Sequence, residues 1–247
     1  MKGLVLAAGY GTRLYPLTLD RPKPLLFVGG RSILSRLLEK LEGVESCDEV
    51  YIVTNAKFTD LIVKWSEEHK YRFAVDVIND MTTSNDDRLG AIGDMDLVFN
   101  KKHPKDDILI IAGDNLFEFD IMNFISFARE RKHFSIALFD VKDIEFARKY
   151  GIVSLDNNGK VVGFQEKPAQ PESTLASTGI YYLPDDKISA FAEYIKTENP
   201  KDAPGNFVKW MSETYGVYGY VFTEGWYDIG DKISLKKADM EYREKGI

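Results

Sequence analysis

Short apolar runs alternate with helical patterns through the first half of the chain, and this alternation constrains the fold more than any other feature. We expect strands at the β-branched apolar runs and helices where apolar residues recur on one helical face. The predicted strands are residues 3–7, 49–54, 74–78 and 107–112, and the predicted helices are 32–41, 58–69, 89–99 and 121–131. Strands separated by such helices form βαβ units, which indicates an α/β fold with a mostly parallel sheet.

The second half is less regular and richer in predicted strands. These are 135–141, 152–155, 161–166, 178–183, 217–222 and 225–229, with helices at 187–196, 207–214 and 232–243. The "DNNG" sequence at 156–159 indicates a hairpin turn. No linker-like composition or internal repeat divides the chain. We therefore predict one domain over 1–247, a three-layer α/β/α Rossmann-like fold with a mixed sheet and a smaller β-rich lobe.

Charge and cysteine content exclude several classes of protein. The net charge is -7 and no Lys/Arg-rich block occurs, so we expect no nucleic-acid partner. Cys47 is the one cysteine and the three histidines are scattered, which excludes an internal disulfide and a zinc cluster. No apolar stretch approaches the roughly 18 residues of a membrane span, and we expect a cytoplasmic protein without a membrane partner. A homo-oligomer remains open.

The richest segment is "LAAGYGTRLYPLTLDRPKPLL" at 6–26, directly after the first predicted strand. Gly9 and Gly11 allow backbone N–H groups to approach an anion closely, and Arg13 and Lys23 add cations within a proline-stiffened loop. These groups suit a triphosphate. On their own, the two glycines would equally suit an ordinary turn. Neither standard phosphate fingerprint is present, because Leu14 occupies the third glycine position of G-x-G-x-x-G.

The same segment resembles the signature of the sugar-phosphate nucleotidylyltransferases, the family of glucose-1-phosphate thymidylyl- and uridylyltransferases. That signature is a strand, then L-A-x-G-x-G-T-R-L-x-P-x-T, then P-K-P-L-L, with Ala8 here where many members have glycine. The resemblance spans essentially the whole chain and includes no β-helix or acyltransferase extension. It implies that Mg²⁺ assists the transfer of a nucleoside monophosphate to a sugar 1-phosphate, with release of pyrophosphate. It implies nucleotide contacts at Leu6, Ala8, Gly9, Gly11, Thr12 and Arg13.

The resemblance also divides the chain by role. Residues 1–135 would form the nucleotide-binding part, and residues 136–247 would form the sugar-phosphate-binding part and the C-terminal helix. The expected partners are therefore a nucleoside triphosphate and a sugar 1-phosphate.

Acidic residues follow two predicted strands that are far apart in the sequence. "IAGDN" places Asp114 at the carboxyl end of a strand, and "WYDIGD" supplies Asp228 and Asp231. Mg²⁺ takes a few carboxylate oxygens and keeps phosphate and water as its other ligands. The resemblance assigns Asp114 and Asp228 to the metal. We interpret Asp231 as the N-cap of the last helix.

The segment "GFQEKPAQPE" at 163–172 carries Glu166 and Lys167. A carboxylate accepts from vicinal hydroxyls and a lysine is a compact cation for phosphate, although an exposed Glu-Lys pair alone is usually an ordinary surface feature. The resemblance assigns Glu166 to the sugar hydroxyls and Lys167 to the sugar phosphate. It adds Asn115, Gly151 and Thr178 to the sugar pocket. The predicted catalytic set is Arg13, Lys23, Asp114, Lys167 and Asp228.

The resemblance implies that the segment after the third predicted strand contacts the base of the nucleotide. Here this segment departs from the family pattern. Residues 79–94, "NDMTTSNDDRLGAIGD", contain no glutamine of the kind that reads thymine. Thr83, Asn85 and Arg88 either contact the base or a phosphate, or merely form a turn and a helix cap. We favour dTTP or UTP with glucose 1-phosphate. A CTP-dependent cytidylyltransferase remains an alternative because Asn85 resembles those relatives.

Three other classes of protein fit less well. A dinucleotide-dependent oxidoreductase requires a third glycine and an acidic residue after the second strand, and neither is clear. A nucleotide-sugar glycosyltransferase requires a D-x-D metal pair, whereas "GDN" has one aspartate. A non-catalytic nucleotide-binding module would not need the complete set of charged positions.

Overall fold

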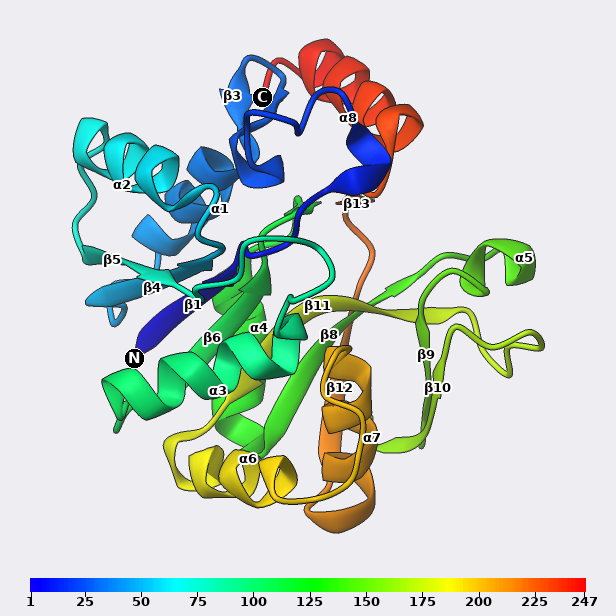
Figure 1. Cartoon of the computed structure of the whole chain (residues 1–247). Helices are drawn as coiled ribbons and strands as arrows, with labels where there is room; N and C mark the ends of the chain where they lie inside the picture. Colours follow the sequence, from blue (N-terminus) through cyan, green and yellow to red (C-terminus); the bar gives the residue numbers. More distant parts are fainter.

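A nine-stranded mixed sheet forms the centre of the computed structural model, which describes all 247 residues (Figure 1). The strands are β1 (Lys2–Leu6), β4 (Glu49–Thr54), β5 (Ala74–Asn79), β6 (Ile108–Ala112), β8 (Phe134–Asp140), β9 (Gly151–Leu155), β10 (Val161–Glu166), β11 (Leu175–Leu183) and β12 (Val217–Phe222). Their order is β10-β9-β11-β6-β1-β4-β5, and β8 joins β11 to β12. Strands β6, β1, β4 and β5 are parallel, so their carboxyl ends meet at one edge.

Helices cover both faces of this sheet. The long helices are α1 (Ile33–Glu42), α2 (Thr59–Glu68), α3 (Gly90–Lys102), α4 (Ile121–Arg131), α6 (Ile188–Ile195), α7 (Pro204–Thr214) and α8 (Lys232–Lys245). Successive strand residues point to opposite faces. Val5 and Ile111 pack in a core with α1, α2 and α4, whereas Leu4 and Ile110 pack in a second core with α3, α6 and α7. The predicted three-layer α/β/α architecture is confirmed.

Two helix starts follow the expected capping chemistry. The Ser32 hydroxyl accepts a hydrogen bond of 3.1 Å from the Ser35 N–H at the start of α1. The Asp231 carboxylate accepts bonds of 2.9 and 2.8 Å from the first turn of α8, and Ser234 completes a capping box. The interpretation of Asp231 as an N-cap is therefore confirmed.

The structure differs from the sequence prediction mainly where elements are short or bent. Helix α7 begins at Pro204, which suits the first helical position, rather than at residue 207. Strand β11 begins at Leu175 and changes register between Ser177 and Tyr181, where Gly179 has a φ of +76°. Three short strands and one short α-helix were not predicted: β2 (Phe27–Val28), β3 (Arg31–Ser32), β7 (Asn115–Phe117) and α5 (Ile144–Ala147). The strand predicted at 225–229 is present as β13 (Trp226–Asp228), which pairs with β7 outside the main sheet.

Strands β9 and β10 form, together with α5, a lobe at one side of the molecule (Figure 1). The two strands are antiparallel, and the hairpin turn predicted at 156–159 joins them. Asp156 closes this turn by accepting hydrogen bonds from the N–H groups of Asn158 and Lys160. The β-rich lobe is confirmed. The boundary at 135/136 stays a prediction, because the main sheet continues through both parts.

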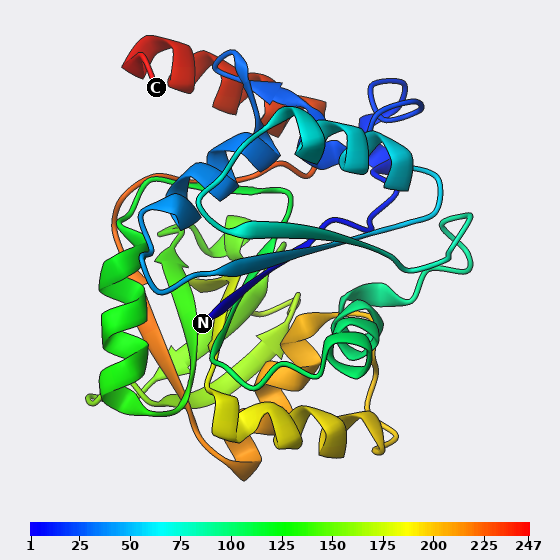
Figure 2. The same ribbon diagram turned by 90° about the vertical axis from the view of Figure 1, so that its left-hand side faces the viewer.

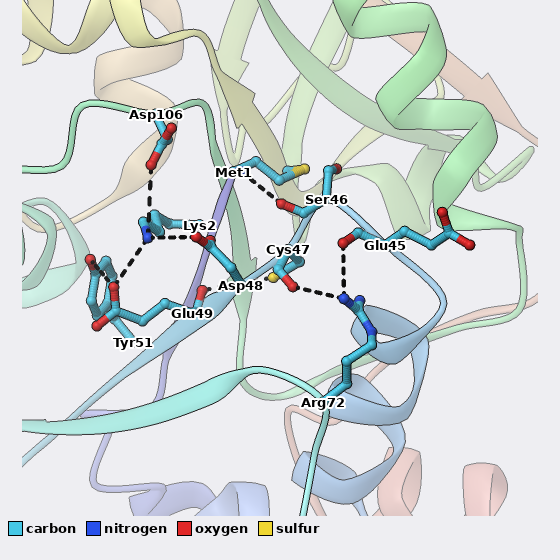
Figure 3. A network of polar contacts seen from close by, with 10 residues as sticks. All are labelled: Met1, Lys2, Glu45, Ser46, Cys47, Asp48, Glu49, Tyr51, Arg72 and Asp106. Carbon is cyan, nitrogen blue, oxygen red and sulfur yellow. Dashed lines mark hydrogen bonds and ion pairs between the residues drawn. The ribbon is translucent and has the colours of Figure 1, made fainter.

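A dense polar network closes the amino ends of the parallel strands (Figure 3). Lys2 Nζ lies 3.1 Å from Asp48, 3.4 Å from Glu49 and 3.8 Å from Asp106. The Arg72 guanidinium donates to the carbonyl oxygens of Glu42, the last residue of α1, and of Val44, Glu45 and Cys47, which follow it. This network ties the start of the sheet to the end of α1.

None of the helices has both the length and the apolar character that a bilayer crossing demands.

Candidate active site

The loop that contains Gly9 and Gly11, called the glycine loop below (residues 7–13), leaves β1 at the carboxyl edge of the sheet. Two side chains from other segments hold it in place. Asn55 Nδ2 donates 2.8 Å to the carbonyl oxygen of Ala8, and Thr18 Oγ1 donates 2.7 Å to that of Gly11. Gly11 has a φ of +61°, in the left-handed region that favours glycine. Gly9 is exposed, and nothing lies within 4 Å of where its Cβ would be. The loop is therefore fixed in shape and open to an approaching ligand.

Lys23 and Asp114 form an ion pair beside this loop. Lys23 Nζ donates 2.7 Å to Asp114 Oδ2, and the Lys23 side chain is 12% exposed. Gly113 allows β6 to end close to β1, because its N–H donates 2.8 Å to the Leu6 carbonyl oxygen and an added Cβ would lie 2.8 Å from the same oxygen. The end of β6 thus presents Asp114 next to the start of the glycine loop.

A small two-stranded ribbon brings Asp228 to the same place. Strand β13 pairs antiparallel with β7 so that Asp228 lies opposite Asn115, and the Ile229 N–H donates 3.1 Å to the Asp114 carbonyl oxygen. Burial, together with the charge of Asp114, raises the pKa of Asp228 to about 6, while Lys23 and Arg13 act in the opposite direction. Two carboxylates and two cations from three distant segments of the chain therefore meet.

The Asp114–Asp228 pair fits a divalent cation. The two negative charges destabilise each other in a partly buried setting, and a cation between them would relieve that repulsion. No three His, Cys, Asp or Glu side chains converge anywhere in the structure as an all-protein metal cage would require. A metal held by these two carboxylates would therefore depend on phosphate oxygens and water for its other positions, which is the preference of Mg²⁺.

A cleft of about 1050 Å³ extends from this charged edge toward the lobe. Its size is at the upper end of the roughly 300–1,000 Å³ of small-molecule sites. Seven of the predicted site residues line it: Arg13, Asn115, Gly151, Glu166, Lys167, Thr178 and Asp228. The predicted sugar residues thus share one cavity with Arg13 and Asp228, whereas the lining does not include Lys23, Asp114 or the other predicted nucleotide contacts of the glycine loop.

Glu166 and Lys167 occupy the lobe side of the cleft, where β10 ends. Burial raises the pKa of Glu166, although the neighbouring Lys167 opposes the shift. Lys167 Nζ lies 3.9 Å from Glu166 Oε1 and its side chain is 67% exposed, so its charge is accessible. Gly151 and Gly205 leave room here: a Cβ on Gly151 would lie 2.6 Å from Phe164, and one on Gly205 would collide with Glu166.

Asn115 and Thr178 hold one wall of the cleft in place. Asn115 Nδ2 donates 2.6 Å to the Thr178 carbonyl oxygen, and Trp226 Nε1 donates 3.1 Å to Asn115 Oδ1. Thr178 Oγ1 donates 2.9 Å to the Ala137 carbonyl oxygen. Both side chains are buried, and most of their hydrogen-bonding capacity is already used inside the protein.

None of the aromatic residues that line the cleft was predicted as a site residue, and two of them lie in contact. Tyr150 and Trp226 both line it, and their rings meet edge to face with centroids 5.0 Å apart. Burial raises the pKa of the Tyr150 hydroxyl, and the carboxylates of Asp228 and Asp231 add to this. Each aromatic lies within two positions of a predicted site residue, Gly151 or Asp228. This closeness in sequence could have identified the two aromatic residues as site candidates, but it could not show that their rings touch.

The predicted base-reading residues lie elsewhere, on an exposed loop between β5 and α3 (Figure 2). Thr83, Asn85 and Arg88 do not line the cleft. The Asp87 carboxylate organises this loop by accepting bonds of 3.0 Å from the Thr83 N–H and 2.8 Å from the Ser84 N–H. Arg88 donates 2.7 Å to the Asn85 carbonyl oxygen. The turn interpretation therefore describes the observed contacts of these residues.

Comparison with known proteins identifies the family. The model of the Nucleotidyl transferase family matches residues 2–245. The chain belongs to this family. The resemblance to the sugar-phosphate nucleotidylyltransferases that the glycine loop indicated is thereby confirmed, and so is the assignment of the chain to the transferases.

Two kinds of curated relative match the chain over nearly its whole length. The bifunctional protein GlmU of Methanocaldococcus jannaschii is 28% identical over 99% of this chain and 55% of its own length. The glucose-1-phosphate adenylyltransferase of Clostridium novyi is 27% identical over 98% of this chain and 66% of its own length. The chain thus spans about half the length of the GlmU relatives that it matches.

Solved structures share the fold over nearly the whole chain. A Bacillus anthracis crystal structure described as a glucose-1-phosphate thymidylyltransferase in complex with a sucrose has a TM-score of 0.84 and 25% identity, and covers 99% of this chain and 96% of its own. A UDP-glucose pyrophosphorylase complexed with UDP-glucose has a TM-score of 0.81 and 21% identity, covering 99% and 98%. At 21% identity, the similarity to the UDP-glucose pyrophosphorylase is evidence for the fold alone.

Proposed function

We propose that this protein joins a nucleoside monophosphate, taken from a nucleoside triphosphate, to a sugar 1-phosphate with the help of Mg²⁺, and releases pyrophosphate. One observation carries the proposal. Arg13 and Asp228 line one end of a single cleft, with the Lys23–Asp114 ion pair beside them, and Glu166 and Lys167 line its other side. A polyphosphate and a phosphorylated sugar would therefore meet end to end.

The triphosphate would lie along the glycine loop, with contacts at Leu6, Ala8, Gly9, Gly11, Thr12 and Arg13. Arg13 and Lys23 would stabilise charge on the departing phosphates. Asp114 and Asp228 would hold Mg²⁺, which supplies neutralisation and alignment of the α-phosphate. This arrangement assigns nucleotide binding to residues 1–135.

Residues 136–247 would position the acceptor. Lys167 would bind its phosphate, and Glu166 would accept hydrogen bonds from the sugar hydroxyls, while Asn115, Gly151 and Thr178 shape the pocket wall. One oxygen of the sugar phosphate attacks the α-phosphorus, a new P–O bond forms, and the bond to the β-phosphate breaks in line. The attacking oxygen is already anionic, so catalysis requires positioning and charge stabilisation rather than a general base.

We favour dTTP or UTP as the nucleotide and glucose 1-phosphate as the acceptor, with CTP as the alternative. The likeness to the thymidylyltransferase structure, at 25% identity, supports dTTP and glucose 1-phosphate. The adenylyltransferase relative shows that the base varies among similar sequences. Thr83, Asn85 and Arg88 remain the proposed base contacts, and they would have to reach the nucleotide from the loop that Asp87 organises.

A pyrophosphate-release matrix tests the proposal. Each of dTTP, UTP, CTP, ATP and GTP is combined with glucose 1-phosphate, N-acetylglucosamine 1-phosphate and mannose 1-phosphate in Mg²⁺, and kcat/KM ranks the pairs. Controls omit the acceptor or add EDTA. We expect release that needs both the acceptor and the metal. A complete matrix without release contradicts the proposal. Release of a free nucleoside diphosphate from a nucleotide sugar would instead indicate a glycosyltransferase.

A further inference from the structure

Two buried carboxyl groups lie outside the site described above. Asp80 follows β5 and Asp94 lies near the start of α3, and they are 5% and 6% exposed. The two groups are within hydrogen-bonding reach of each other. Asp94 Oδ1 is buried and has no hydrogen-bond partner among the protein's donors. Such an orphan is rare because a buried polar group without a partner is costly.

A chain of hydrogen bonds links this acidic pair to the glycine loop. Asp80 Oδ1 accepts bonds of 2.8 Å from both the N–H and the hydroxyl of Thr82. Thr82 Oγ1 lies 3.0 Å from the hydroxyl of Tyr10, which is the residue between Gly9 and Gly11. Because the single Thr82 hydroxyl proton goes to Asp80, the Tyr10 hydroxyl must donate to Thr82. All four side chains are buried.

The acidic pair requires a proton. No cation acts on Asp94, and the titratable groups around the pair are Asp87 from the exposed loop and Tyr10 from the glycine loop. Burial, with a further contribution from Asp80, raises the pKa of Asp94 to about 7. Burial also raises the pKa of Asp80, although the bonds from Thr82 oppose that shift. A proton on Asp94 neutralises one buried charge and supplies the donor that the pair otherwise lacks.

We propose that Asp80 and Asp94 share one proton and act as positioning residues for the nucleoside triphosphate, by holding Thr82 and through it the Tyr10 segment of the glycine loop. This inference rests on the proposed role of that loop as the triphosphate site. Loss of the shared proton leaves two adjacent buried negative charges, which repel each other and displace Asp80 together with Thr82, which stays bonded to it. Nucleotide affinity then falls as the pH rises. The sugar-phosphate side is unaffected, because none of these four residues lines the cleft.

Direct titration calorimetry of Mg²⁺-dTTP and Mg²⁺-UTP at pH 6.5 and 9.0 tests the inference. For the wild type we expect Kd to rise about tenfold between the two pH values, the equivalent of one pKa unit of coupling. In Asp94→Asn the amide donates to Asp80 at every pH, so Kd should change by less than about twofold. Protonation of the nucleotide itself affects all variants equally and cancels in this comparison.

A second variant serves in case Asp94→Asn does not fold. Tyr10→Phe removes only the hydroxyl that joins the glycine loop to Thr82, so nucleotide binding at pH 6.5 should weaken about threefold and lose its pH dependence. Tyr51→Phe is the matched control. Tyr51 is equally buried, and its hydroxyl donates 2.9 Å to Glu49 at the opposite end of the sheet. This control should keep the wild-type pH dependence.

Two outcomes overturn the inference: a Kd that rises in Asp94→Asn as steeply as in the wild type, or full pH dependence in Tyr10→Phe. Failure of the proposed function looks different. If nucleotide binds with the expected pH dependence but no acceptor yields pyrophosphate, the transfer reaction is wrong and the positioning role stands. If pyrophosphate is released while nucleotide affinity is independent of pH, the positioning role is wrong and the reaction stands.

Discussion

Charged side chains are arranged differently at the amino ends and at the carboxyl ends of the parallel strands. At the amino ends, Lys2 is surrounded by three carboxylates, and Arg72 has four carbonyl acceptors. At the carboxyl ends, Asp228 lies beside Asp114, and Arg13 makes no ion pair within the protein. Charges at the first end are all paired, whereas at the second end only Lys23 and Asp114 pair, and Asp228 and Arg13 have no ion-pair partner. Substitutions at the two ends should therefore separate stability from activity.

The largest effect is expected from Asp114→Ala. Loss of a metal carboxylate and of the partner of Lys23 should lower kcat by about three orders of magnitude, similar to the loss of other preorganised electrostatic groups. The free energy of unfolding, measured by urea denaturation, should change little because Asp114 is one-third exposed. Retained turnover would refute the metal assignment. Asp120→Ala is a matched control, because it removes an aspartate that caps α4 away from the cleft.

Glu166→Gln should have the next largest effect. The amide keeps the size of the carboxylate but accepts hydrogen bonds from sugar hydroxyls less strongly, so kcat/KM for the sugar phosphate should fall about 30-fold. KM for the nucleotide should stay unchanged. Initial-rate kinetics with each substrate varied in turn would check this, and an equal rise in both KM values would place Glu166 outside the acceptor pocket.

Arg72→Ala tests the amino ends of the parallel strands, where we expect a substitution to affect stability rather than activity. The carbonyl oxygens after α1 would lose their shared donor, and the free energy of unfolding should fall by about 1–2 kcal/mol. Urea denaturation measures the change. Activity at 25 °C should stay within about twofold of the wild type, since no contact of Arg72 reaches the cleft. A selective loss of kcat would show that the two ends are coupled.

Lys2→Met should have the smallest effect. Its carboxylate partners are 66%, 29% and 50% exposed, so solvent screens much of each attraction. We expect a loss of roughly 0.5–1 kcal/mol in the free energy of unfolding, and a smaller loss in 1 M NaCl than in 0.05 M NaCl. A loss that does not depend on salt would indicate packing of the lysine stem rather than ion pairing.

The sequence predicted well wherever a pattern is long or local. Ten or more residues of helical spacing located α1 and α4, and the glycine-loop signature located Arg13 and Lys23. The strand predicted at 225–229 contains β13, but its partner β7 has only three residues and too little periodicity to recognise, so the ribbon that places Asp228 opposite Asn115 was not predicted. Contacts between distant segments, such as that between Tyr150 and Trp226, arise only from tertiary packing.

The β7–β13 ribbon also sets the order in which the site can be assembled. Asp114 follows a strand from the middle of the chain, but its proposed partner Asp228 docks through one of the last strands to be synthesised. A nascent chain that ends before this ribbon would carry the phosphate loop yet lack the second carboxylate. Metal-bound nucleotide would then stabilise only molecules whose final ribbon is already in place. Substrate would thus favour finished molecules over partly folded ones.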